Sequence, residues 1–187
     1  MTSKLTVQGF SLAEFLIALL IIGELAAFTI PKIIFASQQQ QKMAVFKETL
    51  GALSASVYQF CLSPDSISNP NPYTYTITAI NTVKQCLTNS TTQGCIGSST
   101  SSEATEPGFT LHNGASLAGF RNSAQSREAI VIDWNGSVGP NIIGDDQMTV
   151  AINYTQATPY NGANKCSIAS FSSDTASVTL YQSIHTN

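Results

Sequence analysis

The first 34 residues, MTSKLTVQGFSLAEFLIALLIIGELAAFTIPKII (1–34), decide how this chain is organised. A polar leader that carries one base, Lys4, ends at Gly9, and a run of mostly apolar residues follows from Phe10 to Ile30. A helix of about 20 apolar residues is long enough to cross the hydrocarbon core of a bilayer. The stretch therefore predicts one membrane-spanning helix near the N-terminus.

Two acidic residues, Glu14 and Glu24, interrupt this apolar run. A carboxylate inside a membrane helix is costly and marks a candidate functional position. The order of the parts also differs from a secretory signal peptide, in which the small-residue cleavage site follows the apolar core. Here the small residue, Gly9, precedes the apolar run, so cleavage after it would leave the hydrophobic helix on the mature protein.

This arrangement resembles the processing signal of type IV pilins and of the related pseudopilins of type II secretion. The matching residues are Gly9 before the cut, Phe10 as the new N-terminus, Glu14 and Pro31. The resemblance implies that a prepilin peptidase cuts between Gly9 and Phe10 and N-methylates Phe10. It also implies that Glu14 of one subunit pairs with the Phe10 amine of a neighbour during assembly. Glu24 departs from the family, which usually has an aliphatic residue at this place.

The expected function is that of a structural subunit of a type IV pilus, with a pseudopilin of type II secretion as the alternative. A membrane-anchored binding module is the less favoured third interpretation. The expected partners are other pilin subunits in a helical filament, the prepilin peptidase, the inner-membrane assembly machinery and membrane lipid. The expected location is the bacterial inner membrane before assembly, and an extracellular pilus or a periplasmic filament afterwards.

Apolar residues continue at helical spacing beyond Pro31. One stripe of residues three or four apart comprises Met43, Phe46, Leu50, Leu53, Val57 and Phe60. No proline occurs between Pro31 and Pro64, so we expect one helix from about Phe10 to Cys61, roughly 75 Å long. Pro31 should bend or locally open this helix, because its ring displaces a backbone hydrogen bond.

We therefore expect three parts: a leader (1–9), a membrane-spanning and filament-core helix (10–31) and a pilin-like globular domain (32–187) that includes the second half of the helix. After the helix, Tyr73 to Leu87 is ambiguous: its first residues alternate like a strand, whereas Ile77, Ile80, Val83 and Leu87 fit a short helix, and we favour a turn that leads into a short helix. Thr88 to Pro107 is rich in serine, threonine and glycine and indicates a long surface loop.

The C-terminal part predicts strands. Asn113-Gly114 indicates a hairpin turn, and the β-branched run Glu128–Trp134 is the clearest strand. Met148–Thr155 and Ser177–Ile184 are the expected partner strands. The predicted fold class is thus α+β: a long N-terminal helix packed on a C-terminal antiparallel sheet, which agrees with the fold that the pilin resemblance implies.

Four cysteines, Cys61, Cys86, Cys95 and Cys166, lie outside the apolar segment. Beyond a membrane they can form two disulfides in three possible connectivities. We favour Cys86–Cys95, which encloses a short loop, together with Cys61–Cys166. Four free thiols are the alternative, and a zinc site is less favoured still because no C-x-x-C pair exists.

The run DWNGSVGPNIIGDD (133–146) alternates short oxygen-bearing residues with glycines, so its carboxylates and carbonyls could converge on one hard cation such as calcium. The candidate ligands are Asp133, Asn135, Asn141, Asp145 and Asp146. The run fails as an EF-hand loop, because Val138 replaces the turn glycine and Gly144 the final glutamate. It resembles a run near the C-terminal sheet of other prepilin-type proteins, and some pseudopilins hold calcium in that region. The alternative, which we favour, is a cluster of turns that begins at Asn135-Gly136.

Composition and motifs favour a structural protein over an enzyme. Charged residues make up 10% of the chain and the net charge is −3, so no basic footprint for nucleic acid is evident. The sequence contains neither a G-x-S-x-G elbow nor a phosphate-binding P-loop. His112 and His185 are expected to be surface residues. We expect no cofactor other than the possible calcium ion.

Overall fold

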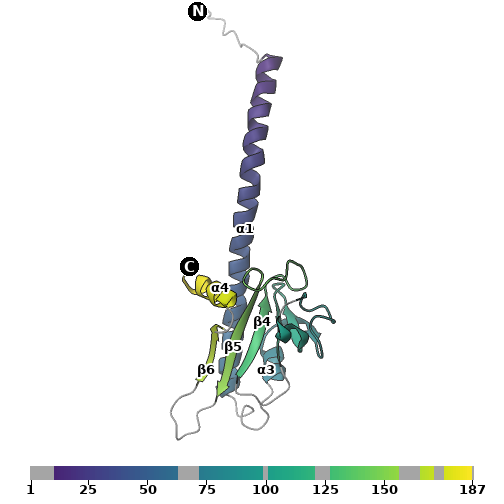
Figure 1. Ribbon diagram of the computed structural model, residues 1–187, viewed down its shortest axis with the longest axis vertical. Helices are drawn as coiled ribbons and strands as arrows, with labels where there is room; N and C mark the ends of the chain where they lie inside the picture. Colours follow the sequence, from purple (N-terminus) through teal and green to yellow (C-terminus); the bar gives the residue numbers. More distant parts are fainter. Residues whose placement is uncertain are drawn as a thin grey trace, which may run out of the picture. The chain divides into compact units, whose positions relative to one another are not determined.

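The computed structural model describes residues 11–62, 72–98, 101–120, 127–155, 165–170 and 175–186. The chain divides into two compact units, Met1–Gln41 and Lys42–Asn187. Helix α1 (Leu12–Leu62) is 51 residues long, close to the predicted bounds, and continues from the first unit into the second. Pro31 lies inside this helix, and the helical assignment is unbroken on both sides of it (Figure 1).

The described part of the first unit is a helix that exposes its apolar side chains on every face. Its leucine, isoleucine and phenylalanine side chains are at least half exposed, from Leu12 at 78% to Phe35 at 62%. Among the described residues, α1 is the one helix that is long and apolar enough to cross a membrane. The predicted membrane-spanning character of this stretch is therefore supported by its length, its composition and its exposure.

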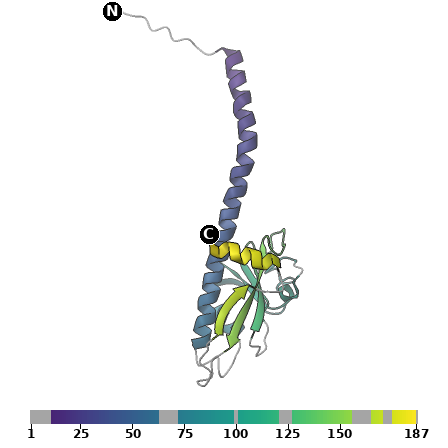
Figure 2. The ribbon, with the colours of Figure 1, turned by 60° about the vertical axis from the view of Figure 1, so that its left-hand side comes forward.

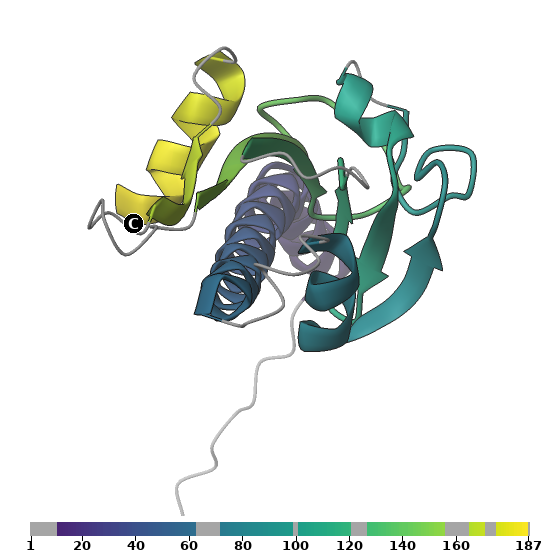
Figure 3. The same cartoon turned by 90° about the horizontal axis from the view of Figure 1, so that it is seen from below.

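The second unit is built on a six-stranded antiparallel sheet whose strands pair in chain order. The strands are β1 (Thr82–Cys86), β2 (Gly108–Leu111), β3 (Ser116–Ala118), β4 (Arg127–Asp133), β5 (Gln147–Thr155) and β6 (Lys165–Ser170). Viewed from below, the strands curve around the blue lower part of α1 (Figure 3). The predicted α+β class, a long helix followed by an antiparallel sheet, is confirmed.

The predicted apolar stripe of α1 forms the centre of the core. Phe46, Leu53 and Val57 are at most 1% exposed, and they share one cluster with inward-facing residues of β2 to β5. Alternate strand residues face opposite sides of a sheet. Accordingly, Ile132 joins this cluster, whereas its neighbour Val131 lies in a second cluster with Ile96 and Ala104. The short 3-10 helix η1 (Ser102–Thr105) covers that second face.

The predicted strand Ser177–Ile184 is wrong, because this stretch lies in helix α4 (Thr175–Thr186). Its buried residues, Ser177, Leu180 and Ile184, are three and four apart and form one helical stripe. Helix α4 packs against β5 and β6 (Figure 2). The Ser177 hydroxyl also accepts a hydrogen bond from the Thr149 backbone N–H at 2.8 Å. The sixth strand is instead β6, which the sequence analysis did not predict.

The turn and following short helix favoured for Tyr73–Leu87 are wrong in their order, because the helix lies in the first half of the stretch and a strand in the second. Helix α3 (Pro72–Ala79) is followed by strand β1. The residues of β1 are exposed or half-buried until Cys86, which is buried. The predicted surface loop Thr88–Pro107 is partly buried, because Ile96 and Ala104 are each 1% exposed. The hairpin turn at Asn113-Gly114 is confirmed, with Gly114 at a φ of 90° between β2 and β3.

The predicted disulfide Cys86–Cys95 is present, with an S–S distance of 2.04 Å. It links the end of β1 to the segment before Ile96 and leaves both cysteines buried. Cys61 at the end of α1 is not a free thiol. The predicted pairing of Cys61 with Cys166 depends on the Cys166 side chain, which lies outside the described residues.

Candidate functional site

The first candidate is the start of α1, where Ser11 and Glu14 form a reciprocal pair of hydrogen bonds. The Ser11 backbone N–H donates to Glu14 Oε2 at 2.8 Å, and the Glu14 N–H donates to Ser11 Oγ at 3.3 Å. This is a capping box, in which two otherwise unpaired backbone donors are satisfied. The Glu14 carboxylate is thereby turned back toward the start of the helix. The S-x-x-E spacing of Ser11 and Glu14 signals this cap, and the sequence analysis missed it.

Gly9 and Phe10, the predicted processing residues, lie outside the described residues. The predicted pairing of Glu14 with a neighbour's Phe10 amine therefore remains a prediction. The capping box bears on it in one respect. Because a carboxylate offers about four acceptor positions, Glu14 can hold its own helix start and still accept a hydrogen bond from another amine.

Glu24 and Lys32 are the two charged residues of the chain between Glu14 and Lys42. Both are exposed on the first unit, among apolar side chains. Within the described stretches of the chain, neither forms a hydrogen bond or an ion pair. The described helix between Glu14 and Lys42 thus carries one acid and one base that have no partner among the described residues.

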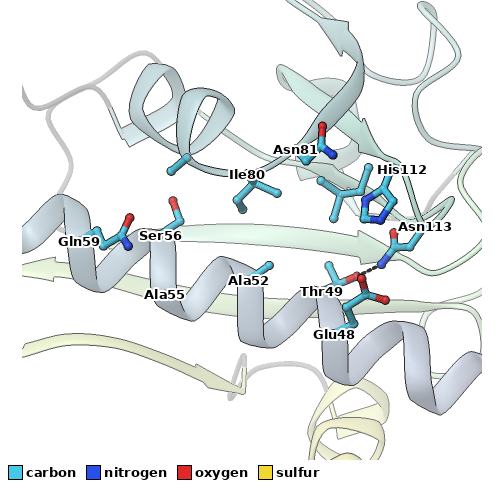
Figure 4. Close-up of a pocket in the computed structure, with 12 residues that line it drawn as sticks. Glu48, Thr49, Ala52, Ala55, Ser56, Gln59, Ile80, Asn81, His112 and Asn113 are labelled. Atoms are coloured by element: carbon cyan, nitrogen blue, oxygen red, sulfur yellow. Dashed lines mark hydrogen bonds between the residues drawn. The ribbon is translucent and has the colours of Figure 1, made fainter.

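The second candidate is a cavity of about 240 Å³ in the second unit, between α1, the end of α3 and the β2–β3 turn (Figure 4). Its walls mix methyl groups with amides and hydroxyls; they comprise Glu48, Thr49, Ala52, Ala55, Ser56, Gln59, Ala79, Ile80, Asn81, Leu111, His112 and Asn113. Asn113 Nδ2 donates to Thr49 Oγ1 at 3.4 Å across one end. Ser56 Oγ is buried without a partner among the described residues, and its side chain points away from α1 in Figure 4.

A further cavity of about 330 Å³ lies between α1 and α4, next to β6. The Tyr181 and His185 rings pack against each other there with centroids 4.3 Å apart, and Tyr181 Oη donates to the Ile168 carbonyl at 3.4 Å. Partial burial raises the pKa of Tyr181 above its ordinary value of 10.0. The two histidines are exposed as expected, His112 at the first cavity and His185 at the second.

The third candidate is the β4–β5 connection, which contains the predicted calcium ligands. Asp133, at the end of β4, is fully buried. Its Oδ1 accepts from the Asn135 N–H at 3.1 Å, and its Oδ2 accepts from Gln147 Nε2 at 2.8 Å. Burial raises the pKa of Asp133 from 3.8 to about 7, in spite of these hydrogen bonds and with a smaller contribution from the nearby Asp146 carboxylate.

Asp146 closes the other end of the same connection. Its carboxylate is 1% exposed and accepts hydrogen bonds from the backbone N–H groups of Asn141 and Ile142. Asn141 has a φ of 55° and Gly144 a φ of 91°, conformations that tight turns use. The favoured interpretation of the run as a cluster of turns agrees with this geometry.

Asp145 pairs with a residue outside the connection. Its Oδ1 lies 2.7 Å from the Nζ of Lys42 on α1. Within the part of the chain that the structure describes, no three histidine, cysteine or acidic side chains gather to hold a metal ion. Three amide oxygens nevertheless lie buried without a partner there, those of Asn135, Asn141 and Gln147. The calcium ligands therefore remain a prediction, and a cation would have to draw Asp145 away from Lys42 if it used all five of them.

The disulfide segment packs on this connection. The Gly97 N–H donates to the Gly136 carbonyl at 3.3 Å, and the Asn141 amide occupies the space that a side chain at Gly97 would need. A glycine is required at position 97 for this close approach. Cys86–Cys95 thus supports the turns around Asp133 and Asp146 through Gly97.

No protein-family model, curated protein or solved structure matches this chain. The geometry of the first unit and of the three candidate sites is therefore the basis for a function.

Proposed function

We propose that this chain is a structural subunit, a prepilin, of a type IV pilus or of the related filament of type II secretion. A prepilin peptidase would cut between Gly9 and Phe10 and methylate Phe10. The inner-membrane assembly machinery would then pack the mature chain into a helical filament through the first half of α1. Before assembly the chain is held in the bacterial inner membrane, and afterwards it belongs to an extracellular pilus or a periplasmic filament.

One observation carries the proposal: the exposed apolar surface of the first unit surrounds the whole helix. Soluble proteins rarely expose apolar patches larger than a few hundred Å². Lipid or other helices must therefore cover such a surface in any state of the protein. The same helix supplies the core stripe of the second unit, so an α1 packed in a filament would display one folded domain per copy.

Glu14 supports a filament over a plain lipid anchor. An acid one turn into an apolar helix is costly in lipid and is stabilised where a cation lies at the same depth. The new amine of a processed Phe10 on a neighbouring copy is such a cation. The pairing would make correct register favourable, because a misplaced copy would leave both charges unpaired.

The direct test is mass spectrometry of the mature N-terminus from the native host. The expected result is a chain that begins with N-methylated Phe10. A chain cut after the apolar run, or one that retains residues 1–9, would overturn the proposal. A Gly9→Val variant should accumulate unprocessed, whereas Gly23→Ala should be processed normally, because an added Cβ at Gly23 has no neighbour within 4 Å in its own chain.

The two uses of the filament require a separate measurement. A strain that lacks the chain should lose surface filaments in electron micrographs if the subunit belongs to a pilus. It should instead retain pili and fail to release secreted enzymes if the subunit is a pseudopilin. A strain that lacks the chain and still has both surface filaments and enzyme secretion would contradict both uses.

A further inference from the structure

The two unpaired charges on the first unit suggest a specific contact between copies. We propose that Glu24 of one copy forms an ion pair with Lys32 of a neighbouring copy that is displaced along the helix axis. This inference rests on the proposed filament and adds a second ion pair to it, beside the pairing of Glu14 with a neighbour's N-terminus.

Each charge needs a partner that its own helix does not supply. Glu24 and Lys32 are eight residues apart, which places them about 12 Å apart along the axis and about 80° apart around it. Ion pairs within one helix form between residues three or four apart. An isolated charge among apolar side chains is costly, whereas a paired one is much less so.

Copies inserted in the same membrane are parallel. If two copies lie side by side at the same depth, Glu24 of one copy is level with Glu24 of the other. Displacing one copy by about 12 Å brings its Glu24 level with Lys32 of the other copy. The displacement is toward the C-terminal end of the helix. The pairing of a neighbour's N-terminus with Glu14 needs a displacement in the same direction, because Phe10 precedes Glu14 in the chain.

The two charges also lie on different sides of the helix. A copy would therefore use its Glu24 side toward one neighbour and its Lys32 side toward another. Such a head-to-tail contact does not close on itself as a two-fold dimer does, and its repetition builds a filament. The ion pair can thus form only after one copy has moved along the membrane normal relative to its neighbour. Such a movement is part of filament assembly, so the ion pair forms during assembly.

Charge reversal tests the pair. Glu24→Lys and Lys32→Glu should each reduce the amount of assembled filament by about tenfold or more, which corresponds to the loss of roughly 1.4 kcal/mol per contact. The double variant Glu24→Lys, Lys32→Glu should restore assembly to within about twofold of the unmodified chain. The amount of processed chain in the membrane is measured in every strain as the control.

Cysteine cross-linking of the full chain in cells that assemble the filament supplies an independent measurement. A disulfide needs Cα atoms within about 7 Å, so residues 24 and 32 of one helix cannot be joined to each other. Under a mild oxidant, the double variant Glu24→Cys, Lys32→Cys should give a ladder of covalent oligomers. Each single variant should stay monomeric, because equivalent positions of displaced copies lie about 12 Å apart along the axis. The pair Leu20→Cys, Lys32→Cys, displaced by one turn on a similar side, should give little ladder.

A double charge reversal no better than the single ones, or cross-linking that stops at dimers, would overturn the Glu24–Lys32 pair. If Glu14→Ala still prevents assembly in the same experiment, the proposed filament stands without that pair. If Phe10 is unprocessed and Glu14→Ala has no effect either, the proposed function itself is wrong.

Discussion

The Nζ atom of Lys42 lies 2.7 Å from Oδ1 of Asp145, and the two residues are 103 positions apart in the chain. The Lys42 side chain is 9% exposed and that of Asp145 is 55% exposed. The contact joins the first turn of α1 within the second unit to the β4–β5 connection. This ion pair thus links helix α1 to the β4–β5 connection, at whose two ends Asp133 and Asp146 lie.

Asp145→Ala should lower the free energy of unfolding by about 1 kcal/mol, because it leaves a nearly buried ammonium without its acceptor while the exposure of Asp145 limits the gain from the pair. Lys42→Met should cost less than Asp145→Ala, since the methionine keeps the apolar contacts of the lysine stem. Urea unfolding of the full chain in detergent is measured for the unmodified chain, both single variants and the double variant. The four free energies of unfolding give the coupling energy between Lys42 and Asp145. A coupling energy near zero would contradict a stabilising pair.

Asp133 should make the fold less stable as the pH rises from about 4 to about 7. Below this range the carboxyl is protonated in both states, and within it the unfolded chain releases the proton that the folded protein, with a pKa of about 7, retains. The slope from one proton is at most about 1.4 kcal/mol per pH unit. The variant Asp133→Asn should show a flatter dependence than the unmodified chain, measured by urea unfolding at several pH values. Identical slopes would show that the Asp133 pKa is not raised.

Calcium should leave the melting temperature of the chain unchanged at millimolar concentration, compared with a chelator. The reason is that Asp133, Asp145 and Asp146 already have internal hydrogen-bond or ion-pair partners. A ligand that binds the folded state raises the melting temperature, so the assay is sensitive to binding. A calcium-dependent increase that disappears in Asp146→Asn would establish the cation site.

Leu53→Ala should destabilise the second unit by about 3 kcal/mol, because Leu53 is fully buried in the core stripe of α1. Tyr58→Ala on the same helix is the control, since the Tyr58 side chain is 60% exposed and should change stability by less than about 0.5 kcal/mol. Thermal unfolding of both variants measures the difference. Equal effects would mean that α1 does not pack on the sheet through this stripe.

Glu14→Ala should be processed at Gly9 but should assemble poorly, because it removes the carboxylate expected to meet a neighbour's amine. Ser11→Ala separates this role from capping. It removes one half of the capping box, at a cost of about 1 kcal/mol, and keeps the Glu14 carboxylate. Filament yield and N-terminal mass are the measurements. If Ser11→Ala impairs assembly as much as Glu14→Ala does, capping alone explains the need for Glu14.

The helix and the fold class were predictable because their signals are periodic and long. The stripe that includes Phe46, Leu53 and Val57 repeats over five turns, and hardly any other arrangement buries it. Ser177–Ile184 was predicted as a strand and is a helix, although its buried residues Ser177, Leu180 and Ile184 are at helical spacing. The helical conformation of this segment depends on its packing against β5 and β6, and such tertiary contacts override strand propensity.

The parts of the candidate sites were predictable to different degrees. The turns at Asn135-Gly136 and Asn113-Gly114 follow from residue type, since these residues adopt left-handed conformations readily. The direction in which each acid points does not follow from residue type. Asp145 and Asp146 are adjacent, yet one pairs with Lys42 on α1 and the other accepts from backbone N–H groups of its own loop. Such a division depends on the path of the backbone and on a helix far away in sequence.

The six strands of the sheet pair in the order in which they are synthesised. Each strand therefore pairs with the strand that comes next in the chain, and no strand has to wait for a later one. Pairings that are local in sequence form faster than distant ones, because little chain entropy is lost in closing them. Helix α1, which provides the apolar surface that the strands cover, emerges from the ribosome before all of them. The order of synthesis thus supplies the template first and the layers that cover it afterwards, so the domain can be completed strand by strand as the chain emerges.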